Sequence, residues 1–583
     1  MCYIIIKKNR KKIIVIILIL FFLGTVITPG INGNIFPLKS RFLMDKENFI
    51  SPFESNAYTL FSPEYSGITY LIDMEGRVVH TWESDYIQGL AVYLLEDGKL
   101  IRNCLPGINP TFMSGGITGR VEIHDWYGNL IWEFEYFSDK NCLHHDYEVL
   151  PNGNILMIAW EYKTLEDAII SGRNPNFLPS DGIWPAHIIE VKPIGPSSGE
   201  IVWEWHAWDH LIQEYDPSKE NYGIVKDHPE LIDINFLDER NPDRDWLHCN
   251  SIDYNEEFDQ IILSVHKFNE IWIIDHSTTT EEAAGHTDGN SGKGGDLLYR
   301  WGNPQTYKAG DESSQKLFGQ HDAQWIQPGC PGQGNILVFN NGLNRPGIDY
   351  SSVVEFVPPV DYYGNYFLEP GTAYGPEESI WKYYAEDPID FFSPRVSGVQ
   401  RLPDGNTLIC EGQSGHFFEV TLEKEIVWEY TNPYPNQVFN DVFKIRRYQS
   451  NYKGLDILNN APIKPKTPEG PSEIKKGIKY YYSSSTMDPQ DDEIYYLFDW
   501  GDGTDSGWLG PYNSSVEVYG FHAWKETGKY EIKLKAVDIN NYESEWSDSF
   551  LVTISRNKPI FNFQFFRFLT RLSIIERLFN LLT

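Results

Sequence analysis

The stretch Phe318-Gly319-Gln320-His321-Asp322-Ala323-Gln324-Trp325 places a histidine at the head of a short strand-like run. A Gly-Asn turn and an apolar run over residues 334–339 follow it. The same order of features recurs from His145 to residues 155–156 and from His248 to residues 261–263. A chain that repeats one strand pattern, with a histidine in each copy, brings those histidines together in space. This pattern therefore predicts both a repetitive β-fold and a histidine cluster.

Two kinds of hairpin alternate between about residues 35 and 448. The first joins a strand, a turn and a Trp-bearing strand, and its six copies contain Trp82, Trp132, Trp203, Trp301, Trp381 and Trp428. The second has an Asp-Gly or Asn-Gly type of turn before an apolar strand, as at 94–101 and 400–409 and in the three histidine copies. Such turns supply the positive φ that tight hairpins need.

Two hairpins in each repeat make one four-stranded sheet. About six such sheets arranged radially form a β-propeller, which leaves few strand edges exposed. We expect residues 438–445 to complete the ring of sheets. A pair of β-sandwiches is the alternative, and the regular repeat argues against it.

The composition restricts the class of partner. The chain has 583 residues and a formal net charge of −34, which argues against nucleic acid because phosphate binding needs a basic surface. Eighteen Trp and 35 Tyr favour strands over helices. The six cysteines contain no CxxC spacing, which argues against a zinc knuckle or a redox pair.

Residues 1–34 have the pattern of a signal peptide or an N-terminal membrane anchor. Basic residues from Lys7 to Lys12 precede the apolar run Ile13–Ile27, which is short for a membrane-spanning helix. The positive charge ahead of the run places the rest of the chain outside the membrane. We expect an exported protein, extracellular or at the cell surface, and the sequence leaves cleavage or anchoring open.

The texture of the sequence changes after the propeller region, 35–450. A Pro-rich linker covers 451–474, and a compact β-pattern covers 475–556. The turn Trp500-Gly501-Asp502-Gly503-Thr504 and the run 521–538 resemble a PKD-type repeat, which implies an immunoglobulin-like β-sandwich acting as a spacer or adhesive module. The apolar and basic tail, 557–583, is either a helix docked on the protein or an interfacial membrane helix.

Alignment of the second hairpin places the histidines at one repeat position. With Leu150, Asp253 and Ile326 taken as equivalent, His145, His248 and His321 each lie five residues earlier. Three imidazoles at one height of a central channel would form a shared site. Such a cluster suits a metal ion, general acid–base work, or nucleophilic catalysis by a neutral imidazole, and spacing alone does not choose.

Several motifs together resemble the arylsulfate sulfotransferase family over roughly 60–450. They are residues 318–324, 340–342, 352–355, 144–154, 246–252 and 402–409. The resemblance implies a six-bladed propeller that moves a sulfuryl group from an aryl sulfate to a phenol by a ping-pong route. It further implies a sulfohistidine intermediate, with neither the nucleotide donor PAPS nor a metal nor another cofactor.

The resemblance also implies roles for individual residues. His321 would be the nucleophile, and His145 and His248 would hold sulfuryl oxygens and assist proton transfer. Asp322, or another carboxylate, would fix the tautomer of His321. We assign substrate binding to Asn250 and Arg345 and include His266 among the catalytic residues.

His266 departs from the family pattern, which has an arginine in this strand. Arginine is a permanent cation whose fork matches oxyanions, and histidine is a weaker, pH-dependent partner. Arg345 is a candidate to replace that charge. An exported binding or adhesion propeller without turnover is the alternative function, and a metal-dependent hydrolase or lyase is a third.

Other features carry less information. Trp246, Trp325, Phe318 and Tyr254 could stack on a phenol ring, although core packing is the commoner role for such residues. The run 292–295 is rich in glycine but lacks the P-loop pattern, so we interpret it as a loop. The sequence does not determine the oligomeric state.

Overall fold

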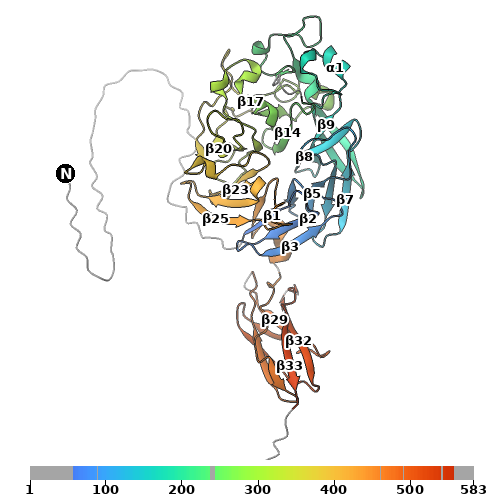
Figure 1. Ribbon diagram of the computed structural model, residues 1–583, viewed down its shortest axis with the longest axis vertical. Helices are drawn as coiled ribbons and strands as arrows, with labels where there is room; N and C mark the ends of the chain where they lie inside the picture. Colours follow the sequence, from blue (N-terminus) through green and yellow to red (C-terminus); the bar gives the residue numbers. More distant parts are fainter. Residues whose placement is uncertain are drawn as a thin grey trace, which may run out of the picture. The chain divides into compact units, whose positions relative to one another are not determined.

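The computed structural model of the protein describes residues 57–556, apart from 88, 237–242, 460, 490–491 and 540–541. Within these residues, six antiparallel four-stranded sheets, here called blades 1 to 6, surround a common axis (Figure 1). A separate β-sandwich follows them in the sequence. The predicted fold class, a six-bladed propeller followed by a β-sandwich, is confirmed.

Each blade consists of two consecutive hairpins, as the two repeated sequence patterns predict. Blades 1 to 3 contain, in sheet order, β26 (Arg446–Gln449), β1 (Ala57–Phe61), β2 (Ile68–Ile72) and β3 (Val78–Glu83); β4 (Val92–Leu94), β5 (Leu100–Cys104), β6 (Arg120–His124) and β7 (Leu130–Glu135); and β8 (Asn141–Val149), β9 (Ile155–Glu161), β10 (Ala186–Ile194) and β11 (Ser198–His206).

Blades 4 to 6 repeat the same order. They contain β14 (Cys249–Asn255), β15 (Gln260–Val265), β16 (Glu270–Asp275) and β17 (Tyr299–Trp301); β18 (His321–Trp325), β19 (Ile336–Asn340), β20 (Ser352–Phe356) and β21 (Trp381–Tyr383); and β22 (Gly398–Arg401), β23 (Thr407–Glu411), β24 (His416–Val420) and β25 (Ile426–Thr431).

The ring closes by pairing the two ends of the propeller sequence. β26 pairs antiparallel with β1, with Tyr448 opposite Tyr58. The sequence places this closing strand over 438–445, but the ladder begins at Arg446, and residues 438–445 form the approach to it. Closure by a strand from the far end of the chain ties the first blade to the last and leaves no open gap between them.

The repeated tryptophans join each blade to the next. Each donates its indole N–H to an oxygen in the neighbouring blade, over 2.8–3.2 Å, and the acceptors are Asp125, Ser198, Thr278, Pro376, Leu422 and Met74 for Trp82, Trp132, Trp203, Trp301, Trp381 and Trp428. A buried indole N–H needs such a partner. The six bonds form a closed circuit, which explains why the tryptophan recurs in the fourth strand.

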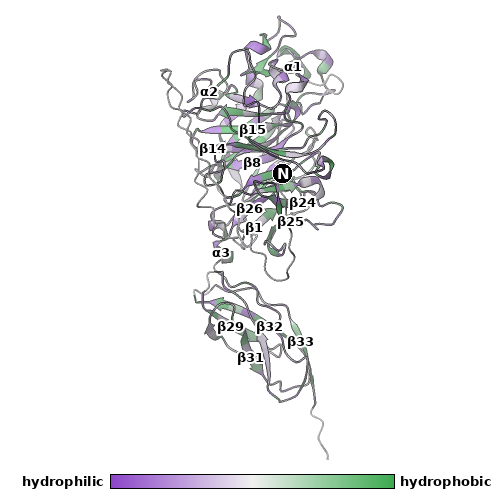
Figure 2. Ribbon diagram, turned by 90° about the vertical axis from the view of Figure 1, so that its left-hand side faces the viewer, coloured by the Kyte–Doolittle hydropathy of each residue, from purple (hydrophilic) through white to green (hydrophobic). Residues whose placement is uncertain are grey.

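The C-terminal β-sandwich has its own core. Its strands are β27 (Glu473–Lys475), β28 (Tyr480–Ser484), β29 (Ile494–Asp499), β30 (Leu509–Tyr512), β31 (Val518–His522), β32 (Gly528–Asp538) and β33 (Phe550–Ser555). One sheet has the order β27-β33-β32-β29-β30, and β28 pairs with β31. Trp500 and Trp524 are buried between them. Figure 2 shows hydrophobic and hydrophilic stretches on the strands of this sandwich.

Helices are short in the described residues. They are α1 (Leu165–Ile170), α2 (Thr280–Ala283) and α3 (Asp456–Asn459), and the short strands β12 (Leu211–Ile212) and β13 (Ile232–Asp233) lie in the connection from blade 3 to blade 4. None of the described helices is long and apolar enough to cross a membrane. The predicted signal or anchor segment, 1–34, and the tail, 557–583, lie outside the described residues.

Candidate functional site

Four histidine rings form a continuous row at one end of the propeller axis. The ring centroids are 4.6 Å apart for His145 and His248, 5.1 Å for His248 and His266, and 5.3 Å for His266 and His321. Phe443 lies 5.9 Å from His145 and 6.2 Å from His321 and so completes a closed circle of five rings. All four histidines predicted for the site are therefore brought together by blades 3, 4 and 5.

The histidines do not all occupy one repeat position. Asp146, Ser251 and Asp322 are equivalent, because each accepts a hydrogen bond from the backbone N–H of the next blade, at Ile252, Ala323 and Val399. One residue earlier in each blade lie His145, Asn250 and His321. His248 precedes Asn250 by two residues, so the predicted alignment is wrong by two residues in blade 4.

Irregular backbone brings His248 to the cluster despite this offset. The strand register shifts between Cys249 and Ser251, and His248 has a left-handed φ of 52°. His145 has a similar φ of 55°, next to a register shift between Leu143 and Tyr147. A left-handed residue at a bulge re-aims its side chain, and such strained positions are common at functional sites.

The contacts of His321 fix its tautomer. Its Nδ1 lies 2.8 Å from Asn341 Oδ1 and 3.2 Å from the Gly319 carbonyl oxygen. The amide of Asn341 cannot be reversed, because its nitrogen donates to the carbonyl oxygens of Ser393 and Val396. Nδ1 of His321 therefore carries the hydrogen, and Nε2 keeps its lone pair free for attack.

Asp322 does not perform the role expected from the sequence. Its carboxylate accepts from the backbone N–H of Val399, pairs with Arg446 at 2.9 Å and approaches Lys444 at 3.4 Å. Although burial raises it, these two cations bring the pKa of Asp322 down to about 2. Lys444 also pairs with Asp146 at 2.6 Å. The carboxylate thus anchors the inner strands, and Asn341 orients His321 in its place.

A buried carboxylate does orient His248. Asp245 Oδ2 lies 2.5 Å from His248 Nδ1 and accepts a second bond from Ser114, and its Oδ1 accepts the indole N–H of Trp160. An imidazole that donates Nδ1–H to a buried carboxylate is held in one orientation and can carry a positive charge. His248 is therefore the ring in this row whose orientation a carboxylate fixes.

His145 is enclosed by neighbours that leave its ring little freedom. Its Nδ1 lies 2.8 Å from Nδ1 of His144, and His144 stacks on Trp160 with the centroids 4.0 Å apart. A Cβ on Gly116 would come within 2.0 Å of the His145 ring, and this glycine has a φ of +81°. Only glycine permits the backbone to pass so close to the imidazole.

Burial holds most of these imidazoles neutral. It lowers the pKa of His321 to about 4, and the neighbouring ring of His248 adds to this effect. The pKa values of His145 and His266 are well below the usual value for the same two reasons, burial first and then the neighbouring imidazoles. Neutral rings with free lone pairs can act as nucleophiles and hydrogen-bond donors at neutral pH.

Two side chains are candidates for holding an anion, the neutral imidazole of His266 and the guanidinium of Arg345. His266 lies within the row, between His248 and His321, and its Nε2 is 3.2 Å from the Cβ position of Gly319. Arg345 packs over Phe318 and Tyr350, and its Nε and one Nη are buried without a hydrogen-bond partner in the described part of the chain. Guanidinium N–H groups that are buried without a partner are costly and point to an anionic ligand.

The other residues that the sequence suggested for the site make contacts that support the fold. Asn250 donates to the carbonyl oxygen of Gln320 and so ties blade 4 to blade 5 beside His321. Trp246 and Trp325 are buried in the core, and Tyr254 packs against His276. Phe318 lies under Arg345. Sequence reasoning gave no site role to Asp245, Asn341, Gly116 or Phe443, because none of them belongs to the repeated histidine pattern.

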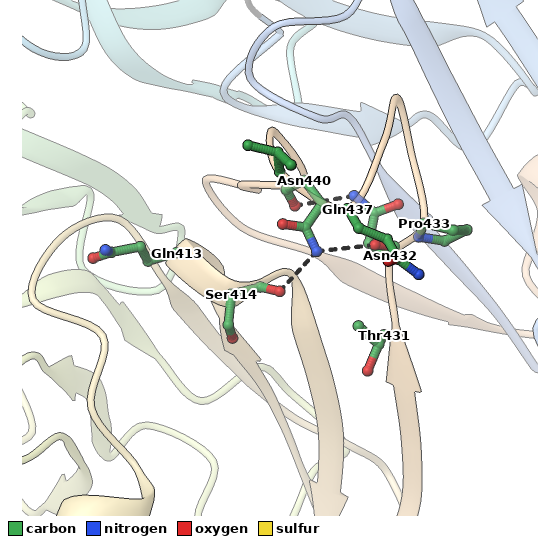
Figure 3. Close-up of a pocket in the computed structure, with 8 residues that line it drawn as sticks. Gln413, Ser414, Thr431, Asn432, Pro433, Gln437 and Asn440 are labelled. Carbon is green, nitrogen blue, oxygen red and sulfur yellow. Dashed lines mark hydrogen bonds between the residues drawn. The ribbon is translucent and has the colours of Figure 1, made fainter.

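A separate cavity of about 510 Å³ opens on blade 6, at the same end of the strands as the histidine row. Figure 3 shows its lining, which is Gln413, Ser414, Thr431, Asn432, Pro433, Gln437, Val438 and Asn440. Asn440 bridges the carbonyl oxygens of Ser414 and Asn432. Its amides and hydroxyls can orient a ligand, but none of the lining residues is a titratable base that would activate a hydroxyl.

The chain is similar in sequence to a known protein. Arylsulfate sulfotransferase AssT of Escherichia coli O6:H1 (strain CFT073) is 28% identical over 408 residues, which cover 60% of this chain and 58% of that protein. The chain thus spans less than two thirds of this relative.

Among solved structures, the PKD domain of an M14-like peptidase from Thermoplasmatales archaeon SCGC AB-540-F20 is 42% identical and covers 16% of this chain and 94% of that domain, with a TM-score of 0.15. Apo AztD from Citrobacter koseri is 12% identical and covers 81% of this chain and 100% of that structure, with a TM-score of 0.28. Both scores are too low to support a conclusion. The sequence match to the arylsulfotransferase (ASST) family extends over residues 45–453, more than half of the chain, and the protein belongs to that family.

Proposed function

We propose that the protein transfers a sulfuryl group from an aryl sulfate ester to a phenolic acceptor, through a sulfohistidine on His321 and without PAPS. The observation that carries this proposal is the fixed tautomer of His321. Its Nδ1–H is donated to Asn341 and Gly319, and burial keeps the ring neutral, so the Nε2 lone pair is available for attack. Family membership supports the same chemistry.

In the first half-reaction, Nε2 of His321 attacks sulfur and the bond from sulfur to the aryl oxygen breaks. The leaving phenolate takes a proton from His248, which is paired with Asp245. Sulfuryl transfer to Nε2 makes the imidazole ring more positive, and the oxygens of Asn341 and Gly319 stabilise that charge through Nδ1–H. Positioning and charge stabilisation account for most of the catalysis in transfers of this kind.

In the second half-reaction, the acceptor phenol attacks the sulfur and gives its proton to neutral His248. The bond between sulfur and Nε2 breaks, and His321 returns to its starting state. His145, His266 and Arg345 supply hydrogen bonds and charge for the sulfuryl oxygens. The position of His266 within the row, together with the unpaired Arg345, favours an enzyme over a binding propeller without turnover.

A metal-dependent reaction at this site has less support. Across the described residues, the groups whose metal-ligating atoms converge to within 4.8 Å lie on the outer strands and loops of blades 3 and 4. The export predicted from residues 1–34 stays a prediction.

The test uses 4-nitrophenyl sulfate as donor and phenol as acceptor. We expect the unaltered chain to release nitrophenol and form phenyl sulfate, and the donor alone to add one sulfuryl group to the protein, visible by intact-protein mass spectrometry. His321→Ala should abolish both the adduct and turnover. His276→Ala, which removes an imidazole on the outer strands, is the matched control. Turnover that survives in His321→Ala would contradict the assignment of the nucleophile.

A further inference from the structure

Three side chains far from the axial row converge where blade 3 meets blade 4. His210 follows β11, and His286 and Asp296 lie in the loop between α2 and β17. Nδ1 of His210 and Nδ1 of His286 each lie 2.8 Å from the same oxygen, Oδ1 of Asp296. We call these three residues the edge triad. Neither the proposed sulfuryl transfer nor the family resemblance involves them.

The hydrogen positions in the edge triad leave room for a cation. Nε2 of His210 lies 2.8 Å from the carbonyl oxygen of Ala283, which can only accept, so Nε2 carries a hydrogen. In a neutral ring, Nδ1 then holds a lone pair that faces a carboxylate oxygen. Two lone pairs at 2.8 Å repel each other unless a proton or a metal ion lies between them.

The surroundings of His210 are those of a metal ligand. The ring is completely buried and stacks on Trp205, and its second nitrogen is held by a backbone carbonyl. Such an outer hydrogen bond fixes the tautomer and orientation of ligating histidines in general. Gly295 permits the close approach, since a Cβ there would lie 2.0 Å from the Ala283 oxygen and 2.7 Å from His210 Nε2.

A second cluster of possible metal ligands, on blade 3, differs from the edge triad in the orientation of its rings. His187, Glu204 and His206 also bring ligand atoms within 4.8 Å of one another. Their two imidazoles are nearly parallel, however, with an interplanar angle of 17° and centroids 4.1 Å apart. Each imidazole lone pair lies in the plane of its own ring, so lone pairs in two stacked planes converge poorly on one ion. The rings of His210 and His286 are perpendicular, at 87°, which lets both nitrogens point at a common centre.

We propose that the edge triad binds one divalent transition-metal ion of the zinc class, through Nδ1 of His210, Nδ1 of His286 and one oxygen of Asp296. Two imidazoles and a carboxylate are a ligand set that zinc accepts, with water completing the coordination. The exposed side of His286, with 59% of its side chain accessible, gives solvent access to the fourth position. The ion would clamp the glycine-rich loop of blade 4 onto the end of blade 3.

The test measures zinc bound to the full chain, produced without a histidine tag. We expect about one zinc per chain after gel filtration, and a lower melting temperature when a chelator removes it. His286→Ala should lose the metal and fold normally, because this side chain is exposed. His228→Ala removes another half-exposed histidine, which faces Glu230, and should keep the metal. Cobalt substitution should give a visible absorption band that the His286→Ala variant lacks.

Three results would overturn the proposal. They are no retained zinc in the unaltered chain, equal retention in His286→Ala, or loss of zinc in His206→Ala but not in His286→Ala. The first result would leave a histidinium–aspartate pair in the edge triad, and the third would move the site to the other cluster. Sulfotransferase turnover plays no part in this readout, so the two proposals fail independently.

Discussion

Histidines at the propeller axis and histidines on the outer strands differ in what they face. His321 faces an amide, a carbonyl and other imidazoles, and burial lowers its pKa to about 4. His276 lies 2.6 Å from Asp259 and 3.0 Å from Glu190. Although burial lowers it, these carboxylates raise the pKa of His276 to about 9. The same residue type is thus a neutral, reactive ring at the axis and a charged structural link on the outer strands.

His248 differs from the other histidines of the axial row in its partner. It is the one predicted site histidine among the described residues that pairs with a carboxylate, Asp245. A row of imidazoles without that carboxylate would have a nucleophile but no oriented proton carrier. The comparison teaches that the partner of each ring, rather than its burial alone, divides the work among the histidines.

Removing the carboxylate partner of His248 should have the largest effect on turnover. In Asp245→Asn, the amide nitrogen would face Nδ1 of His248 and the amide oxygen would still accept from Trp160. The hydrogen of neutral His248 would then move from Nδ1 to Nε2, and Nδ1 would have no hydrogen to donate. This tautomer is the wrong one for carrying a charge. We expect kcat to fall by about 10²–10⁴-fold at neutral pH with an unchanged fold. Steady-state kinetics and circular dichroism test this, and unchanged kcat would remove His248 from proton transfer.

Removing the unpaired guanidinium should have the next largest effect. Arg345→Gln keeps much of the packing on Phe318 and Tyr350 but deletes the charge. If Arg345 holds a sulfuryl oxygen, we expect kcat/KM to fall by roughly 10²–10³-fold. Because its Nε and one Nη lack a hydrogen-bond partner in the described residues, stability should rise or stay constant. Loss of stability with unchanged kcat/KM would instead give Arg345 a structural role.

Removing the charged contacts of His276 should lower the stability of the fold and leave turnover unchanged. His276→Gln removes the charge that Asp259 and Glu190 share, and we expect the free energy of unfolding to fall by about 1–3 kcal/mol, with turnover unchanged. A folded-state pKa above the unfolded value contributes stability below about pH 6.5, which is lost as the pH rises through about 9. The melting temperatures of the two proteins should therefore differ at pH 6 and converge above about pH 9. A constant difference would argue against a charged His276.

The axial site should in turn tolerate acid better than a free histidine would. Since the pKa of His321 lies near 4, the ring stays neutral, and nucleophilic, well below its usual pKa of about 6.5. Below that usual value the unfolded chain binds a proton that the folded ring refuses, so stability falls as the pH drops from about 6.5 toward 4.

The sequence by itself determined the architecture and the reactive residue type. Six copies of a Trp-bearing hairpin predict six blades, because turn chemistry and strand periodicity act over a few residues. The recurring histidine likewise marks where the imidazole rings gather. These signals are local, and they survive even where the alignment slips by two residues at His248.

Only the tertiary structure decided which partner each histidine meets. Asn341 lies 20 residues after His321, and Phe443 closes the circle from the other end of the propeller sequence. Asp322, next to His321 in the sequence, turns away to Arg446, since neighbouring residues on a strand face opposite sides. Partners set by contacts between distant segments leave no mark in a local pattern. The roles of these imidazoles therefore depend on the closure of the ring.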